Sequence, residues 1–360
     1  MERVLVSAKD LSTLVEALFR HAGVSPADAA TIAKVQLDAD LRGMHSHGMR
    51  AVPTYLDRIR SGVINPTPMV RVDDLGAVAA VYGDDGPGQV VAVRAMEECV
   101  ARARKYHVGI ATVCRSNHFG AAGFYVGMAA AANLIGFATT NGNLVLAPPD
   151  SLTPTVGNNP IAIGAPADEE PDFVLDVAMS VVAGGKVDLA AAEGDELPDG
   201  WCFDADGRPT RELSAALAGL GIPLGAPTAG HKGFGLALGM EILAGALTGS
   251  AFGRQHTLEV DDGPRPWDEG HFFLAIDPAI TMPLADFKAR VDQMIREVRD
   301  TRPVPGGPAA RAPGVSAAAR RERALRKGIS MPGSIVKRLN ECANAAGLLP
   351  IPEDGKTALP

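Results

Sequence analysis

The short motifs that mark the commonest enzyme classes are absent from this chain of 360 residues. It contains no G-x-G-x-x-G, no G-x-x-x-x-G-K-[ST], no G-x-S-x-G, no H-E-x-x-H and no EF-hand loop. These absences argue against a standard Rossmann dinucleotide site, a P-loop nucleotide site, a serine hydrolase and a zinc protease. Any catalytic site must therefore be built from less familiar groups.

Cysteines and membrane signals are also scarce. The four cysteines are scattered and form no C-x-x-C pair, which is typical of free thiols in a reducing cytosol. The opening "MERVLVSAKD" has no basic segment followed by a long apolar run, and no stretch reaches about 18 apolar residues. We therefore expect a cytoplasmic protein with no signal peptide and no transmembrane helix.

Positive charge is outweighed by negative charge. The chain has 34 Lys and Arg residues against 42 Asp and Glu residues, a formal net charge of −8. This balance gives no reason to expect a nucleic-acid or membrane partner. Apolar residues make up 46% of the chain and charged residues 21%, an ordinary globular composition. The length suits one large domain or two modest ones.

The first part of the chain is predicted to be helical. Ser7 can cap a helix whose apolar residues recur at helical spacing, namely Leu11, Leu14, Val15 and Leu18. Ser25 followed by Pro26 predicts a second helix that runs to about Arg42, and a third is predicted over 52–60. The stretch "LRGMHSHGMR" therefore lies between two helices, where polar side chains can converge.

From about residue 77 helices and strands mix without a regular β-α-β rhythm, which favours an α+β fold over a doubly wound sheet. The runs 159–167 and 171–180 are predicted to be paired strands, because a charged turn joins them. The other expected strands are 77–82, 109–116 and 270–277, and the expected helices are 89–108, 122–135 and a long apolar helix over 233–249 that packs on a sheet.

The chain ends are predicted to meet. The Pro/Gly-rich segment 302–314 cannot form a long helix, and two helices are expected after it, near 316–327 and 334–346. We therefore predict three parts. The first is an N-terminal helical part, the second a central mixed-sheet domain that binds a cofactor, and the third a linker with C-terminal helices that pack on the first. Their bounds are 1–75, 76–300 and 301–360.

Polar groups gather at a few predicted strand ends and helix starts, where exposed and rigidly held side chains usually lie. They are His45-Ser46-His47, Ser116-Asn117-His118, Gly157-Asn158-Asn159, Asp176 with Ser180, and Gly230-His231-Lys232.

Each of these clusters is open to more than one interpretation. The H-S-H stretch can chelate a metal with His118 as third ligand, or His47 can simply donate to carbonyls at a helix end. Asn117 can be a plain helix cap. Lys232 and His231 can be solvated side chains, or the helix start and the Lys232 cation can bind a phosphate. No carboxylate stands at a spacing that completes a metal site, so we predict none.

Several longer motifs occur together in the order and approximate spacing of one family. They are "RGMHSHGMR", "RSNHFGAAGFY", "TVGNNPIAIGAP", "DVAMSVVAGGK", "GHKGFGLALGMEILAGALTG" and "GHFFLAIDP". With them the chain resembles the malate/L-lactate dehydrogenase family, which is unrelated to the Rossmann-fold dehydrogenases and includes ureidoglycolate, sulfolactate and 2,3-diketogulonate oxidoreductases. The resemblance covers nearly the whole chain.

The resemblance implies a non-Rossmann fold with its own NAD or NADP site, built as a homodimer. It also implies hydride transfer between the nicotinamide and a small carboxylate substrate, a 2-hydroxy or 2-oxo acid. Two alternatives stay open: reduction of a cyclic imino acid such as piperideine-2-carboxylate, or a non-catalytic dimer that binds a small molecule.

The resemblance also assigns roles to individual residues. His47 matches the proton donor, and an imidazole with an ordinary pKa of about 6.5 suits proton transfer near neutrality. Asn117 and His118 match an active-site pair, and Ser46 and Arg50 are expected to bind substrate. The expected cofactor-binding residues are Asn158, Leu175, Asp176, Val177, Ala178, Met179, Ser180, Val181, His231, Lys232, Gly314, Val315 and Ser316.

The chain departs from the family at three of these places. Ala51 stands where many relatives have an arginine that can clamp a carboxylate, which leaves Arg50 as its nearest substitute. Asn158 replaces a usual threonine, and Val315 replaces a usual acidic residue.

Overall fold

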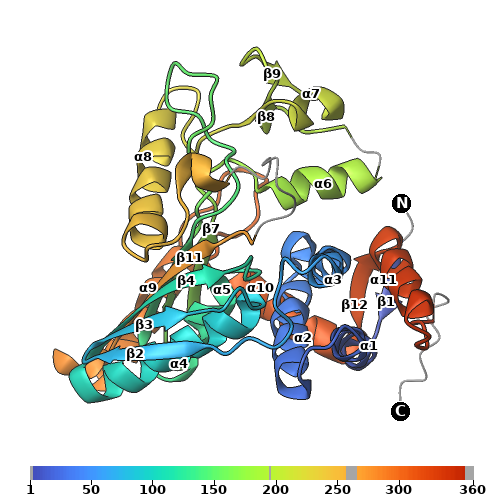
Figure 1. Ribbon diagram of the computed structural model, residues 1–360. Coiled ribbons are helices and arrows are strands. Elements are labelled where there is room, and N and C mark those ends of the chain that lie inside the picture. Colours follow the sequence, from blue (N-terminus) through green and yellow to red (C-terminus); the bar gives the residue numbers. More distant parts are fainter. Residues whose placement is uncertain (1–2, 194–195, 257–265, 353–360) are drawn as a thin grey trace.

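The computed structural model describes residues 3–193, 196–256 and 266–352, and Figure 1 shows their arrangement. Its centre is a seven-stranded mixed sheet in the order β2-β3-β4-β11-β5-β6-β7. The strands are β2 (Arg71–Leu75), β3 (Val78–Tyr82), β4 (Val108–Ser116), β5 (Ile135–Thr140), β6 (Ile161–Ala165), β7 (Phe173–Val177) and β11 (Glu269–Ile276).

Only β3 and β4 run parallel, and all the other neighbours in the sheet are antiparallel. A parallel pair needs a crossover, and α4 (Gly88–Tyr106) supplies it. The predicted pairing of 159–167 with 171–180 is confirmed, since β6 and β7 form an antiparallel pair.

Helices cover both faces of the sheet. On β11, Phe273 and Ala275 point into the core beneath α4 and α5 (Gly123–Ala131). Gly270 points the other way, where an added Cβ would overlap the carbonyl oxygen of Ala244. The second face therefore belongs to α8 (Gly230–Glu241) and the π-helical turn η3 (Ile242–Ala246) that continues it.

The two chain ends build one helical unit. Its helices share a single buried core, and its short strands β1 (Arg3–Val6) and β12 (Ile329–Pro332) pair antiparallel. The helices are α1 (Ala8–His21), α2 (Pro26–Leu41), α3 (Val52–Arg60), α10 (Val315–Lys327) and α11 (Gly333–Ala345). Ser7 and Ser25 cap α1 and α2 as expected, each accepting hydrogen bonds from backbone N–H groups.

The α+β fold is thus confirmed, while the bounds at 75 and 300 stay a prediction. The sequence pattern did not predict β1, β2, β5 or β12. It also missed α6 (Gly184–Glu193), α7 (Leu213–Leu217), α9 (Leu284–Arg299) and a small sheet of β8 (Cys202–Phe203), β9 (Pro209–Thr210) and β10 (Leu220–Gly221). Short 3-10 turns complete the described chain: η1 (His45–His47), η2 (Met49–Ala51), η4 (Gly253–His256) and η5 (Pro278–Ile280).

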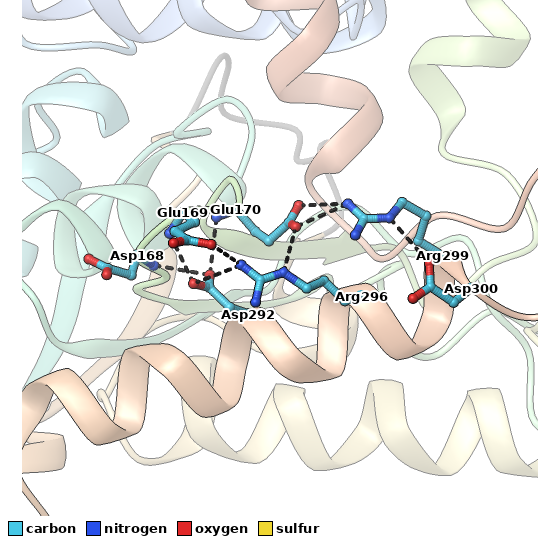
Figure 2. Close-up of polar contacts among 7 residues, drawn as sticks. All are labelled: Asp168, Glu169, Glu170, Asp292, Arg296, Arg299 and Asp300. Atoms are coloured by element: carbon cyan, nitrogen blue, oxygen red, sulfur yellow. Dashed lines mark hydrogen bonds and ion pairs between the residues drawn. The ribbon is translucent and has the colours of Figure 1, made fainter.

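The turn between β6 and β7 is fastened to α9 by a charged cluster (Figure 2). The buried Asp292 carboxylate accepts the backbone N–H groups of Asp168, Glu169 and Glu170 at 3.1, 2.9 and 3.1 Å. Burial alone would raise the pKa of Asp292, but the three donors and Arg296 lower it overall. Glu170 also pairs with Arg296 and Arg299, so each charged group in the cluster has a partner.

None of the helices in the described parts of the chain combines the length and the hydropathy needed to cross a bilayer.

Candidate active site

The loop between α2 and α3 carries the H-S-H stretch and is held in place by a buried carboxylate. Asp40 accepts the backbone N–H of Met49 at 2.7 Å and lies 2.6 Å from Nδ1 of His45. The Arg3 guanidinium lies 3.1 Å from Nε2 of His45. Because arginine can only donate, Nε2 accepts and Nδ1–H donates to Asp40. Both ring nitrogens of His45 are therefore engaged in holding the loop.

Gly48 allows this loop to close against Asp40. A Cβ at Gly48 would lie 2.2 Å from a carboxylate oxygen of Asp40, so only glycine leaves room. The closed loop holds the neighbouring residues Ser46 and His47 in position. Oγ of Ser46 lies 2.9 Å from Nδ1 of His47.

His47 faces His118, which follows the end of β4. The two rings are stacked, with centroids 6.0 Å apart. Burial lowers the pKa of His47 to about 4, and the charges of Arg50 and Lys186 add to the effect. Burial, His47 and His271 lower the pKa of His118 to about 3. Both rings are therefore neutral at pH 7 in the ligand-free protein.

Tyr55 of α3 sets the tautomer of His118. Its hydroxyl lies 2.6 Å from Nδ1 of His118, and the backbone N–H of Gly120 donates to the same nitrogen at 3.4 Å. Burial, followed by the charge of Glu269, raises the pKa of Tyr55, so its hydroxyl keeps its proton and donates it to Nδ1. The imidazole hydrogen must then lie on Nε2, where His118 can donate it to a ligand oxygen.

Asn117 is held by its amide hydrogens. Its Nδ2 donates to the carbonyl oxygens of Asp85 at 2.8 Å and Gly86 at 2.9 Å, which fastens the turn before α4. Its Oδ1 is buried and has no hydrogen-bond partner among the described residues. Asn117 can therefore accept a hydrogen bond from a ligand, but its amide hydrogens are already donated within the protein.

A buried histidine that the sequence analysis did not select supports this strand end. His271 on β11 lies 2.7 Å from Oγ1 of Thr140 on β5 and 2.8 Å from Oγ of Ser116 on β4. Burial lowers its pKa to about 3, so it bridges three strands as a neutral ring. Because Ser116 immediately precedes Asn117, this bridge fixes the position of the Asn117–His118 pair.

The expected substrate residues Ser46 and Arg50 lie beside the start of α6, which packs on η1. A Cβ at Gly185 would come within 2.8 Å of the carbonyl oxygen of Ser46 and 3.1 Å of a guanidinium nitrogen of Arg50. The structure thus brings Ser46, His47 and Arg50 together, and adds Lys186 from α6 to their surroundings.

The segment after β7 connects several of the expected cofactor residues. The N–H of Met179 donates to the carbonyl oxygen of Asn158 at 2.7 Å, and the carbonyl of Met179 accepts from Leu224 at 2.8 Å. Ser180 is buried and its hydroxyl donates to the carbonyl of Val182 at 2.8 Å. The chain continues from residue 224 into α8, whose first turn exposes His231 and Lys232.

The remaining expected residues lie along β7. The Asp176 carboxylate accepts the N–H of Gly123 at the start of α5 at 2.7 Å, and burial raises its pKa. Gly314 has a φ of +94°, and a Cβ there would lie 2.8 Å from the backbone of Asp172 and of Val174. This glycine lets the 314–316 segment approach β7.

Of the other residues expected to bind the cofactor, Leu175 and Ala178 are half-buried, and Val177 and Val181 are exposed. Val315 packs in a small apolar cluster with Ala312 and residues of α9, and the Ser316 hydroxyl accepts from Arg311 at 3.3 Å. The side chain of Asp176 is therefore committed to α5, while the exposed valines leave an apolar surface on the β7 edge.

The structure adds six residues to the candidate site. Two of them, Tyr55 and Arg58, could have been selected from the sequence, because they lie three residues apart on one face of the expected helix over 52–60. The others depend on contacts between remote segments: Asp40, Lys186, Glu269 and His271. No group of three or more His, Cys, Asp or Glu side chains in the described ranges can hold a metal ion.

Comparison with known proteins identifies the family. A family model described as malate/L-lactate dehydrogenase matches residues 6–340. Malate dehydrogenase from Pyrococcus abyssi is 35% identical over 350 residues, covering 96% of each chain. The NAD+-dependent ureidoglycolate dehydrogenase of Escherichia coli K12 is 32% identical over 335 residues, covering 93% of this chain and 94% of the relative.

The same family appears among solved structures. Malate dehydrogenase from Pyrococcus horikoshii OT3 superimposes with a TM-score of 0.88 at 32% identity, covering 97% of each chain. Other matches are named sulfolactate dehydrogenases, one of them NADP+-dependent, and a Δ1-piperideine-2-carboxylate reductase. These findings confirm the resemblance seen in the sequence motifs and the expected class of NAD(P)-dependent hydroxyacid oxidoreductases. The chain belongs to the malate/L-lactate dehydrogenase family.

Proposed function

We propose that this chain oxidises a small 2-hydroxy acid and reduces the matching 2-oxo acid, with His47 as the acid/base and His118 as a hydrogen-bond donor to the reacting oxygen. The observation that carries the proposal is the stacked His47–His118 pair, with Ser46 and Arg50 beside it. Two stacked and buried imidazoles with strongly lowered pKa values form a pattern that clusters at functional sites.

The chemistry follows from the protonation of the two rings. The bound nicotinamide supplies or accepts the hydride, and the proton is left to side chains of this chain. Ser46 can accept the Nδ1 hydrogen of His47, which leaves a lone pair on Nε2 for the proton of the substrate hydroxyl. The Nε2–H of His118 can donate to the same oxygen and stabilise the charge that develops there.

Arg50 couples substrate binding to the pKa of His47. Its positive charge is one reason for the low pKa of His47 in the ligand-free protein. A substrate carboxylate bound to Arg50 neutralises that charge, so the pKa of His47 rises and the ring can carry the proton needed for reduction. Arg50 would thereby bind the substrate carboxylate in place of the arginine that many relatives have where this chain has Ala51.

The dinucleotide is proposed to lie along the β7 edge. Support comes from the packing of Asn158, Met179 and Ser180 against one another, and from the 314–316 segment at the same strand. The exposed Lys232 at the first turn of α8 can bind a phosphate group through its ammonium group. The cofactor is NAD or NADP, since named relatives use each of them.

We also propose a homodimer. Five large apolar side chains on α8, η3 and the loop after them expose between 44% and 57% of their surface: Leu236, Leu238, Ile242, Leu247 and Phe252. Figure 1 shows α8 at the periphery of the molecule. An apolar patch of this kind is typical of a surface that another protein covers, and a second copy is the expected occupant. Ile242→Glu should convert the dimer to a monomer in sedimentation velocity.

The cytoplasmic location and the lack of a nucleic-acid partner stay proposals. The four thiols, none of them in a disulfide, and the net charge of −8 support them.

The reduction of a cyclic imino acid is the second candidate, favoured by the solved reductase named above. The deciding experiment follows NADH and NADPH absorbance with oxaloacetate, pyruvate, 3-sulfopyruvate, 2,3-diketogulonate and piperideine-2-carboxylate. Turnover of a 2-oxo acid is expected. Turnover of piperideine-2-carboxylate alone would favour the second candidate, and silence on all five would contradict both.

A further inference from the structure

Glu269 is a buried acid for which the proposed chemistry has no role. It is the first residue of β11, and its Cα lies opposite that of Ser116, just before the Asn117–His118 pair. Only 4% of the residue is exposed. A Cβ added to Gly142 would be 3.5 Å from its Oε1, so a glycine backbone borders the carboxyl on that side. Glu269 is therefore held next to the residues that bind the reacting oxygen.

Its polar atoms are not satisfied within the described part of the chain. Oε2 of Glu269 is buried without a hydrogen-bond partner, and so are Nε of Arg58 and Nε1 of Trp267. The Arg58 guanidinium lies over the Trp267 ring, 3.0 Å from its centroid, and no ion pair with Glu269 within 4.0 Å occurs among the described contacts. One acceptor and two donors are thus left buried and unused, which a folded protein rarely tolerates without a reason.

These groups are linked electrostatically to His118. Tyr55 and Arg58 lie three residues apart on α3, and Tyr55 donates to Nδ1 of His118. The charge of Glu269 raises the pKa of Tyr55, and that of Arg58 lowers the pKa of His118. Glu269 and Arg58 therefore both act on the Tyr55–His118 pair. Arg50, which lies beside the start of α6, acts on the same pair through its charge.

A carboxyl group in this position can distinguish between substrates that differ in the group at the end remote from the reacting carbon. Burial raises the pKa of Glu269 to about 8, with Arg58 opposing the shift, so the acid is largely neutral at pH 7. A ligand N–H or O–H can satisfy Oε2 in either protonation state. A second carboxylate or a sulfonate cannot donate to Oε2. It can only accept the O–H of the neutral acid, which leaves Oε2 unsatisfied, and it is repelled once the acid ionises.

We propose that Glu269 determines substrate specificity by accepting a hydrogen bond from the far end of the substrate, so that the preferred substrate is a 2-oxo or 2-hydroxy acid with a hydroxyl, amide or ureido group there rather than a second anion. The inference rests on the proposed function, because it takes the first carboxylate to pair with Arg50. It separates this chain from family members named for malate or sulfolactate.

The test uses two 2-oxo acids that differ only at the far end: oxaloacetate and its 4-amide, 2-oxosuccinamate. The ratio of kcat/KM for the amide over oxaloacetate is measured for the unmodified protein and for Glu269→Gln, Glu269→Leu and the control Glu97→Gln on the exposed side of α4. Calorimetry gives the same ratio from Kd in the complex with NAD+, in which the 2-oxo acids cannot be reduced, so the result does not depend on turnover. Thermal melts check that each variant is folded.

The unmodified protein and the control should favour the amide about tenfold or more, as one well-made hydrogen bond would allow. Glu269→Leu should lose that preference. In the unmodified protein the kcat/KM for oxaloacetate should fall as the pH rises through about 8, and Glu269→Gln should lack this fall.

Equal ratios within twofold for the unmodified protein and Glu269→Leu would overturn the proposal, and so would a preference for oxaloacetate that Glu269→Leu does not change. A shift in the Kd ratio without NADH oxidation by any form of the protein would contradict the proposed function and leave the assignment of Glu269 intact.

Discussion

Two clusters of charged and titratable groups in this molecule are built on opposite principles. At the turn between β6 and β7, the Asp292 carboxylate accepts three backbone N–H groups, and its pKa is lowered, so it stays ionised (Figure 2). Around His118 the shifts all favour neutral forms: the pKa values of His47 and His118 fall and that of Glu269 rises. The first cluster is complete within the protein, whereas the second still has unused donors and acceptors.

The difference shows how a polar cluster that stabilises the fold can be told from one that binds a ligand. Fixed N–H donors provide at Asp292 what water provided in the unfolded chain, so ionisation costs little. Oε2 of Glu269 and Oδ1 of Asn117 are buried without partners in the described chain. Such atoms raise the energy of the empty protein, and a bound ligand can lower it again.

The largest expected effect is on catalysis. His47→Gln keeps the volume of the side chain but removes the proton transfer, so kcat should fall by about 10³-fold or more while NADH binding stays within twofold. Steady-state kinetics and fluorescence titration of NADH check the two parts. A variant that retains a tenth of the activity would rule out His47 as the acid/base.

The second effect is on stability. Asp292→Ala leaves three N–H groups without their acceptor and should lower the free energy of unfolding by about 3 kcal/mol. Urea unfolding measures the change, with the exposed Asp300→Asn as control. If Asp292→Ala instead abolished activity without loss of stability, the contrast between the two clusters would be wrong.

The third effect is a dependence of stability on pH. In the unfolded chain His47, His118 and His271 bind protons near pH 6.5, but in the folded protein only near pH 4 or 3. The unfolded state therefore binds more protons below pH 6.5, and stability falls as the pH drops from 6.5 towards 4. Each ring contributes a slope of about 1.4 kcal/mol per pH unit. The raised pKa of Glu269 acts in the opposite direction and offsets about one of the three rings, so urea unfolding between pH 7.5 and 4.5 should show a net loss of stability, and a flat profile would contradict the neutral rings.

The smallest effect concerns the tautomer of His118. Tyr55→Phe removes the donor to Nδ1 and leaves the hydrogen free to move from Nε2, so kcat should fall about tenfold with little change in the KM for the cofactor. The single variant His118→Ala and the double variant Tyr55→Phe/His118→Ala serve as the comparison. If the two substitutions reduced kcat independently, Tyr55 would not act through His118.

Local signals in the sequence were sufficient for many of the helices and strands and for selecting His47 and His118 as candidates. Ser7 and Ser25 cap the helices they were expected to cap, since a cap depends on three or four neighbouring residues. His47 and His118 were selected from short motifs, which keep their residue types together in the chain. Even so, the expected helix over 233–249 ends as the π-helical turn η3, which no local sequence pattern predicts.

Only the tertiary structure decided how remote residues meet. The pairing of β1 with β12, the Tyr55–His118 hydrogen bond and the Glu269 position opposite Ser116 join residues between 63 and more than 300 positions apart. Four-residue strands and single polar side chains carry no periodicity, so nothing local distinguishes them. The sequence by itself selected the groups that are proposed to carry the chemistry, because short motifs keep their residue types together. Packing determined their protonation, because burial and unpaired charges exist only in the folded chain.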